Sequence, residues 1–335
     1  MNDQAPENIT TRHFRVCPHC GQMTPALLPE CASCGARSLH SAADVTRARG
    51  EEHFISAFLR RATPVTYAIF GFNVVIFLLM NFASVYPLKL QLIFGADPET
   101  LKAFGAKTND LITKGDYFRL VTPIFIHIGL LHLLTNSYAL WIVGPQVEKL
   151  YGSARFALLY LGSGIGGALG SYLNPLSSRT STVPGAGASG ALFGLFGVLA
   201  VFGFKYRAEL PEVFRRAFGA GVLPVILLNL LIGYSIQFID NAAHIGGLLT
   251  GAVLAWLIPY IKPGEERVTR AGLILLALCV TIVSFSFTRA WQQSGKYLPR
   301  RARSPHTAML YSNFNSILSG GLSCQSDGSE YSARA

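Results

Sequence analysis

The chain has 335 residues, of which 50% are hydrophobic and only 14% are charged. Soluble domains carry roughly 25% charged residues, so this composition excludes an ordinary soluble globular protein. A net charge of +10 would fit a nucleic-acid-binding protein, but the charges are grouped between long uncharged runs, which indicates membrane topology and no nucleic-acid partner.

The N-terminal region contains a Cys-x2-Cys, ten residues, Cys-x2-Cys pattern, formed by Cys17, Cys20, Cys31 and Cys34. This spacing can place four thiolates in the tetrahedron of a structural zinc site. Two disulfides or a redox pair are the alternatives, although a cytoplasmic N-terminus disfavours disulfides. We expect a zinc-ribbon-like module with four cysteine ligands over residues 1–40, with a structural zinc ion and no open catalytic position. The sequence indicates no partner for this module.

Residues 41–61 connect the module to the apolar part of the chain. Residues 35–50 are typical of a linker. Phe54, Ile55, Phe58 and Leu59 then fall on one helical face, which fits an interfacial helix or an ordinary linker helix.

Seven uncharged runs of at least 18 residues follow, and each is long enough to cross a bilayer as a helix. In chain order they are 62–88, 120–147, 156–178, 180–204, 217–239, 241–261 and 271–288. The sequence therefore predicts an all-α, multi-pass membrane protein with its transmembrane domain over 62–290. No cleavable signal peptide is expected, because the first 60 residues are polar. The Ser/Gly-rich tail over 291–335 is predicted to be disordered.

Basic residues mark the orientation of these spans. The short loops after spans two, four and six hold nine of them: Lys149, Arg155, Lys205, Arg207, Arg215, Arg216, Lys262, Arg267 and Arg270. The loops after spans three and five hold only Arg179. The positive-inside rule then places the N-terminus in the cytoplasm. The 33-residue segment 87–119 lies outside and is expected to pack as a subdomain or a gate.

Span two carries polar side chains in an apolar setting. His127, His132 and Asn136 are expensive there unless they have partners or a task. His132 and Asn136 are four residues apart and share a helical face. Interhelical hydrogen bonds are one explanation of these residues, and a reaction site is the other.

The centre of the sequence is a loop rich in Gly and Pro that runs into span four at Ser189. A serine in the first turn of a helix could attack a carbonyl while its own N–H binds the oxyanion. The alternative is a helix-capping serine in a small-residue packing motif.

Span six begins with Asp240, a good N-cap, and places His244 one turn into the helix. Gly247 and Gly251 face the same way, as do the glycines of span four, so the two helices can meet backbone to backbone. Spans two, four and six run in the same direction, so Asn136, Ser189 and His244 can lie near one end of the bundle. The residues alone thus indicate a candidate Ser/His dyad in a membrane.

Four motifs in order resemble the rhomboid family of intramembrane serine proteases: His132 with Asn136, the Glu148–Gly152 exit, Gly187-Ala188-Ser189-Gly190, and Ala243-His244 followed by Gly247 and Gly251. The resemblance implies a rhomboid-like bundle of six core helices plus a seventh, and cleavage of the transmembrane segments of membrane-protein substrates.

The resemblance also implies roles for individual residues. Ser189 would be the nucleophile and His244 the general base, with Phe193 packed under the imidazole and no cofactor needed for catalysis. His132, Asn136 and the Ser189 N–H would form the oxyanion hole. The site would open to the non-cytoplasmic side of a membrane, taken to be a bacterial inner membrane.

One departure from the family concerns the start of span two, where Phe118-Arg119 stands in place of the frequent Trp-Arg and leaves the anchoring of the outer segment open. Two other functions stay open. An inactive rhomboid-like scaffold or chaperone would lack the serine or the histidine, and both are present. A transporter would be compatible with intramembrane His, Asn and Asp, but no inverted repeat is visible.

Overall fold

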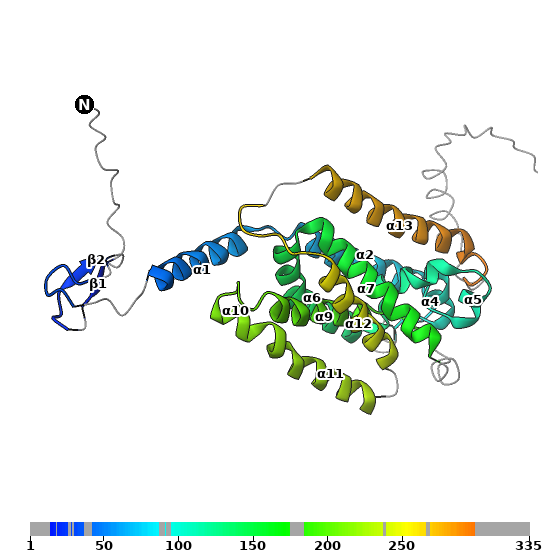
Figure 1. Ribbon diagram of the computed structural model, residues 1–335. Helices are drawn as coiled ribbons and strands as arrows, with labels where there is room; N and C mark the ends of the chain where they lie inside the picture. Colours follow the sequence, from blue (N-terminus) through cyan, green and yellow to red (C-terminus); the bar gives the residue numbers. More distant parts are fainter. Residues whose placement is uncertain are drawn as a thin grey trace, which may run out of the picture.

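The computed structural model describes residues 14–17, 19–25, 28, 30–36, 42–86, 91, 95–174, 184–236, 239–265 and 269–298. Over these residues the protein is an all-α membrane protein with one small antiparallel sheet near its N-terminus (Figure 1). The sheet pairs β1 (Phe14–Val16) with β2 (Met23–Pro25). Arg179, Arg267, Cys324 and almost all of the predicted tail lie outside the described residues.

Seven helices correspond to the seven predicted spans: α2 (Pro64–Ala83), α6 (Gly129–Tyr151), α7 (Ser153–Leu173), α9 (Ser189–Lys205), α11 (Leu223–Ser235), α12 (Asn241–Leu257) and α13 (Arg270–Ser294). The stretches Gly50–Ala83, Ser153–Leu173 and Arg270–Ser294 are long and apolar enough to cross a membrane. In Figure 1, α13 and α11 lie on opposite sides of a central group that includes α7, α9 and α12. The prediction of a seventh apolar helix is thus confirmed.

The start of span two differs from the prediction. The uncharged run begins at residue 120, but α6 begins only at Gly129, where φ is +75°. Two 3-10 helices, η1 (Tyr117–Leu120) and η2 (Thr122–Phe125), precede it. Pro123 has no N–H to continue a helix, and a positive φ at Gly129 interrupts one. The prediction from the uncharged run therefore placed the start of this helix too early.

The described part of the connection between α2 and α6, expected to be a subdomain or a gate, packs against α2. It contains α4 (Pro98–Phe104) and α5 (Asn109–Thr113). Asp97 caps α4 by accepting a 2.9 Å hydrogen bond from the N–H of Thr100. A separate hydrophobic cluster joins the connection to α2, formed by Ile76, Met80, Ala96, Leu101, Ala106 and Ile126. Its contacts hold this segment against the bundle.

The predicted glycine contact between α9 and α12 is present. A Cβ on Gly247 would overlap the carbonyl oxygen of Gly190, and a Cβ on Gly251 would overlap that of Gly194. Only glycine allows two helix backbones to approach this closely.

Helix α7 packs against α12 in the same way. A Cβ on Gly167 would lie 2.8 Å from the carbonyl oxygen of Ala243, and one on Gly170 would lie 2.9 Å from that of Ala242. Both distances are shorter than the 3.4 Å at which ordinary van der Waals contact begins, so a side chain at either glycine would overlap the backbone of α12. Helices α7, α9 and α12 therefore form one backbone-to-backbone unit.

The connecting helix α1 (Ala42–Arg60) covers almost all of the predicted connecting segment 41–61, and it begins eight residues before residue 50, where the linker-like composition ends. The rings of Phe54 and Phe58 pack against Phe214, with centroids 5.2 and 4.9 Å away. Phe214 belongs to the short helix α10 (Glu212–Ala217), which precedes η3 (Gly219–Val222). Only part of the predicted apolar face is used, because Leu59 is exposed.

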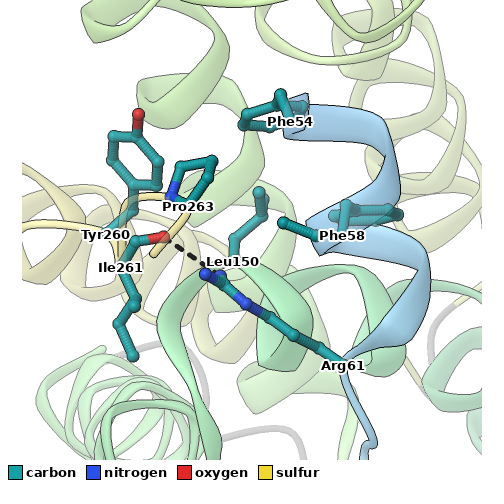
Figure 2. Close-up of a pocket in the computed structure, with 8 residues that line it drawn as sticks. Phe54, Phe58, Arg61, Leu150, Tyr260, Ile261 and Pro263 are labelled. Carbon is teal, nitrogen blue, oxygen red and sulfur yellow. Dashed lines mark hydrogen bonds between the residues drawn. The ribbon is translucent and has the colours of Figure 1, made fainter. Parts of the chain in front are cut away.

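Arg61 ties α1 to two other segments at the end of the bundle remote from Ser189. Its guanidinium donates to the carbonyl oxygens of Lys149 at 2.7 Å, Ile261 at 3.0 Å and Lys262 at 3.1 Å. A small pocket lies between this arginine, the phenylalanines of α1 and Tyr260 (Figure 2). The arginine thus anchors the C-terminal end of α1 to the bundle.

The exit of α6 explains the Glu148–Gly152 motif. The buried carboxylate of Glu148 accepts hydrogen bonds from the N–H groups of Val65 and Thr66 and from the hydroxyls of Thr66 and Ser153. An anion at the N-terminus of α2 satisfies orphan helix donors and complements the helix dipole. The glutamate therefore joins three helices at one point.

Candidate active site and metal centre

Ser189 is the first residue of α9 and is half-buried. The loop before it is held by backbone contacts to distant segments. The N–H of Gly187 donates to the carbonyl of Pro123 at 2.9 Å, and Gly187 itself has φ +128°. The helical pattern begins at the serine because Gly187 holds a conformation that other residues rarely adopt. The N–H of Ser189 therefore belongs to the unpartnered first turn.

His244 lies one turn into α12, whose first N–H groups are capped by Asp240 as predicted. The Asp240 carboxylate accepts a 3.1 Å hydrogen bond from the N–H of Ala243 and also binds the hydroxyl of Ser171. The imidazole is buried and stacks on the ring of Phe193, with centroids 4.0 Å apart and planes inclined by 10°. Its Nδ1 is buried and has no hydrogen-bond partner among the described residues.

The same stacking brings the serine and the histidine to one place. Phe193 is four residues after Ser189 and so lies one helical turn below it. Gly190, next to the serine, faces Ala243, next to the histidine: a Cβ there would lie 3.4 Å from the Ala243 carbonyl oxygen. The two predicted catalytic residues are therefore on facing turns of adjacent helices.

His132 lies in the first turn of α6 and contacts the loop that carries Ser189. Its Nδ1 accepts a 3.3 Å hydrogen bond from the N–H of Ile128. In a neutral imidazole the proton is then on Nε2, which makes Nε2 a donor. A Cβ on Gly187 would lie only 2.6 Å from that Nε2. The donor edge of His132 thus contacts a residue two positions before Ser189.

Asn136 lies one turn further along α6 and is buried. Its amide nitrogen donates to the carbonyl oxygen of His132 at 2.8 Å. One of its two N–H groups is therefore engaged within the helix, and the second is available to another acceptor. His132 and Asn136 share a face as predicted, while the role of Asn136 stays a prediction.

The sequence analysis did not predict the contacts between the α2–α6 connection and the loop that precedes Ser189. Lys107, in the α2–α6 connection, pairs with Gly185 through two backbone hydrogen bonds of 2.7 and 2.9 Å. Arg119 is almost fully buried and donates to the carbonyl oxygens of Lys102 and Ala106. No local pattern marks a single pair of residues that lie so far apart in the chain. These contacts anchor the outer segment, although Phe118 stands where the family often has tryptophan.

The four N-terminal cysteines are brought together by two matching turns. The N–H of Gly21 donates to the carbonyl of Cys17, and the N–H of Gly35 donates to that of Cys31, at 2.8 and 2.9 Å. Both glycines have positive φ, of 72° and 68°. The four sulfur atoms lie within 4.8 Å of one another and form no disulfide.

The sulfur geometry fits a zinc ion. Two of the sulfur pairs, Cys17 with Cys34 and Cys20 with Cys31, are 3.8 and 3.7 Å apart. A tetrahedron of thiolates about 2.3 Å from zinc has edges of about 3.8 Å. Backbone N–H groups of Cys34 and Ser33 lower the pKa of the Cys31 thiol to about 6, while the neighbouring sulfur of Cys34 helps to raise the pKa of Cys20 to about 12. The donor set therefore matches a closed structural site.

Comparisons with known proteins concern the membrane part of the chain. A family profile described as Rhomboid domain matches residues 114–261. The chain is 44% identical over 184 residues to Rhomboid protease GluP of Bacillus subtilis, covering 54% of this chain and 34% of that protein. It is 37% identical over 156 residues to Putative rhomboid protease YdcA of the same organism, covering 47% and 73%.

The chain is also similar to a plant protein. The chain is 32% identical over 202 residues to RHOMBOID-like protein 5 of Arabidopsis thaliana, covering 55% of this chain and 61% of that protein. The chain thus spans about a third of the length of GluP and about three-fifths of the plant protein. The profile match includes His132, Asn136, Ser189 and His244, while the four cysteines lie outside it.

Proposed function

This chain belongs to the rhomboid family, and we propose that it is an intramembrane serine endopeptidase that cleaves transmembrane segments of membrane-protein substrates. In this proposal Ser189 is the nucleophile and His244 is the general base. The observation that carries it is the stacking of His244 on Phe193, one turn below Ser189, across the glycine contact of α9 and α12. A nucleophile and its base must lie within hydrogen-bond reach, and facing turns of two helices in backbone contact allow this.

The proposed reaction follows the logic of serine hydrolases. The Ser189 hydroxyl attacks the scissile carbonyl while His244 accepts its proton and later delivers it to the leaving amine. Water then hydrolyses the acyl-enzyme by the same route. Phe193 holds the imidazole plane, and the Asp240 cap holds the first turn of α12. In this proposal the imidazole of His244 is therefore oriented without a third catalytic acid in contact with the ring.

The oxyanion would be bound by three donors. They are the N–H of Ser189 in the first turn of α9, the Nε2–H of His132 and the second N–H of Asn136. The tautomer of His132 supports its part, because Ile128 occupies the other ring nitrogen. Preorganised donors of this kind are each worth about 10²-fold or more in rate.

Cleavage of a single-pass model substrate by the purified protein tests the proposal. Wild type is expected to cleave, and Ser189→Ala and His244→Ala are each expected to lose more than ~10³-fold of the rate while keeping wild-type helicity. A fluorescent phosphonate should label wild type and not Ser189→Ala. Residual turnover within about tenfold of wild type in either folded variant would rule out the dyad. Absence of cleavage and labelling in wild type would favour the scaffold or chaperone alternative.

We further propose that Cys17, Cys20, Cys31 and Cys34 hold one structural zinc ion. The sulfur spacings of 3.7 and 3.8 Å support this, as do the two matching turns. Zinc would supply folding free energy to a module too small to build a core. Because all four ligands would be protein thiolates, the ion would take no part in peptide hydrolysis.

The orientation in the membrane is also a proposal. Arg61, Lys149, Lys205 and Lys262 lie at the end of the bundle remote from Ser189. The positive-inside rule places that end, and the N-terminal module, in the cytoplasm. The site would then open to the non-cytoplasmic side, with a bacterial inner membrane as the expected location. Labelling of single introduced cysteines with a membrane-impermeant reagent tests this arrangement.

A further inference from the structure

Helix α13 ends against the connection between α2 and α6 (Figure 1). The side-chain nitrogen of Gln293 donates a 2.8 Å hydrogen bond to Asp116. Tyr297 packs on the guanidinium of Arg119, with the ring centroid 5.3 Å from Cζ. Ala290 fills the space beside Gly105, where a Cβ would lie only 3.2 Å from the alanine methyl. The last turns of α13 and the residues just after it thus make specific contacts, whereas most of the helix is exposed.

Asp116 passes this contact on to Arg119. One carboxylate oxygen accepts from Gln293, and the other accepts from Nε of Arg119 at 3.3 Å. The guanidinium is 1% exposed and donates to the carbonyl oxygens of Lys102 at 2.8 Å and Ala106 at 3.0 Å. A buried guanidinium that loses its carboxylate partner is strongly unfavourable. Gln293 therefore helps to hold Asp116 in the orientation in which its carboxylate accepts the hydrogen bond from Arg119.

Arg119 in turn fixes the backbone that touches the serine loop. The Ala106 carbonyl, held by Arg119, belongs to the residue before Lys107. Lys107 pairs with Gly185, four residues before Ser189, through two backbone hydrogen bonds. The path from α13 to the nucleophile loop therefore runs through hydrogen bonds between described residues and through the peptide bond that joins Ala106 to Lys107.

We propose that Gln293 is a positioning residue and that α13 is part of the active-site scaffold. The helix holds Asp116 and Arg119 so that Lys107 keeps the loop of Ser189 in its reactive conformation. This inference rests on the proposed protease function. It gives the seventh helix a role in the chemical step, although none of the proposed catalytic residues lies on that helix.

Substitutions at Gln293 test the inference in the full-length protein. Gln293→Leu removes the donor, and Gln293→Glu sets a second carboxylate against Asp116. Both are expected to lower kcat for a single-pass substrate about tenfold and to slow phosphonate labelling of Ser189 equally, with KM little changed. Gln292→Leu is the matched control, because Gln292 is exposed and contacts Arg289 instead. It should stay within about twofold of wild type.

A double-mutant cycle separates a positioning role from a purely structural one. If Gln293 acts through Asp116, Gln293→Leu should lower kcat about tenfold in the wild-type protein and less than about twofold in an Asp116→Ala background. Wild-type cleavage with Gln293 variants equal to Gln292→Leu would overturn the inference. So would an effect of Gln293→Leu that is equally large in the Asp116→Ala background, or a loss confined to the yield of folded protein. Inactive wild type would instead overturn the protease proposal itself.

Discussion

Replacing Gly247 tests the contact on which the site geometry depends. Gly247 lies three residues after His244, and a Cβ there would overlap the Gly190 carbonyl oxygen and lie 2.7 Å from its carbon. Both sides of the contact are backbone, so no side chain can rotate to make room. Alanine at this position can fit only if α12 and α9 move apart.

The size of that movement follows from the distances. An ordinary contact begins at 3.4 Å, so the Gly190 carbonyl carbon must move by at least about 0.7 Å, the difference between 3.4 and 2.7 Å. Ser189 is one peptide bond away and moves with it. A misplacement of about 1 Å can lower a rate about 10²-fold, so Gly247→Ala should lose roughly 10- to 100-fold in kcat. Gly247→Leu should lose more.

Cleavage of a single-pass substrate by folded, monodisperse protein measures the effect. Gly71→Ala is the matched control, because Gly71 lies in α2 and a Cβ there meets nothing within 4 Å. Its turnover should stay within about twofold of wild type. If folded Gly247→Ala cleaves as fast as Gly71→Ala, the two helices are not in contact along this face, and the approach of Ser189 to His244 needs another explanation.

Two further outcomes are expected. Asn136→Ala should lower kcat about 10²-fold in the same assay, as loss of an oxyanion donor does, and a change confined to KM would contradict that role. Metal analysis of the full-length protein should find one zinc ion per chain, and a Cys17→Ser/Cys20→Ser variant should lose it. That variant should still cleave substrate, since the cysteines belong to none of the helices that carry the dyad; a folded but inactive variant would show that the module takes part in catalysis.

The parts of the site that depend on local spacing could be read from the sequence. Asp240 caps α12 because a short acceptor stands just before the helical pattern, whereas the stacking of Phe193 on His244 is implied by the family resemblance. The glycine contact follows from small residues at helical spacing. These features require only the helical period and a rule of close approach.

Other parts depend on backbone torsion or on distant partners. The start of α6 is set by Pro123 and the positive φ of Gly129, which a count of uncharged residues does not detect. The contact of Gln293 with Asp116 joins residues 177 positions apart, and nothing in either neighbourhood specifies the other. The α2–α6 connection could be expected to pack, but its partner helix could not be named.

The backbone contact of α7, α9 and α12 has a consequence for how the surrounding lipid acts. These helices meet backbone to backbone, so hydrophobic mismatch has little room to alter their spacing. Helix α11 is different, since only Ile226 and Gly233 are buried along it. Changes in bilayer thickness should therefore tilt or displace α11 while the three packed helices keep their relation. Lipid composition would then change the position of α11 and leave the arrangement of Ser189 and His244 nearly constant.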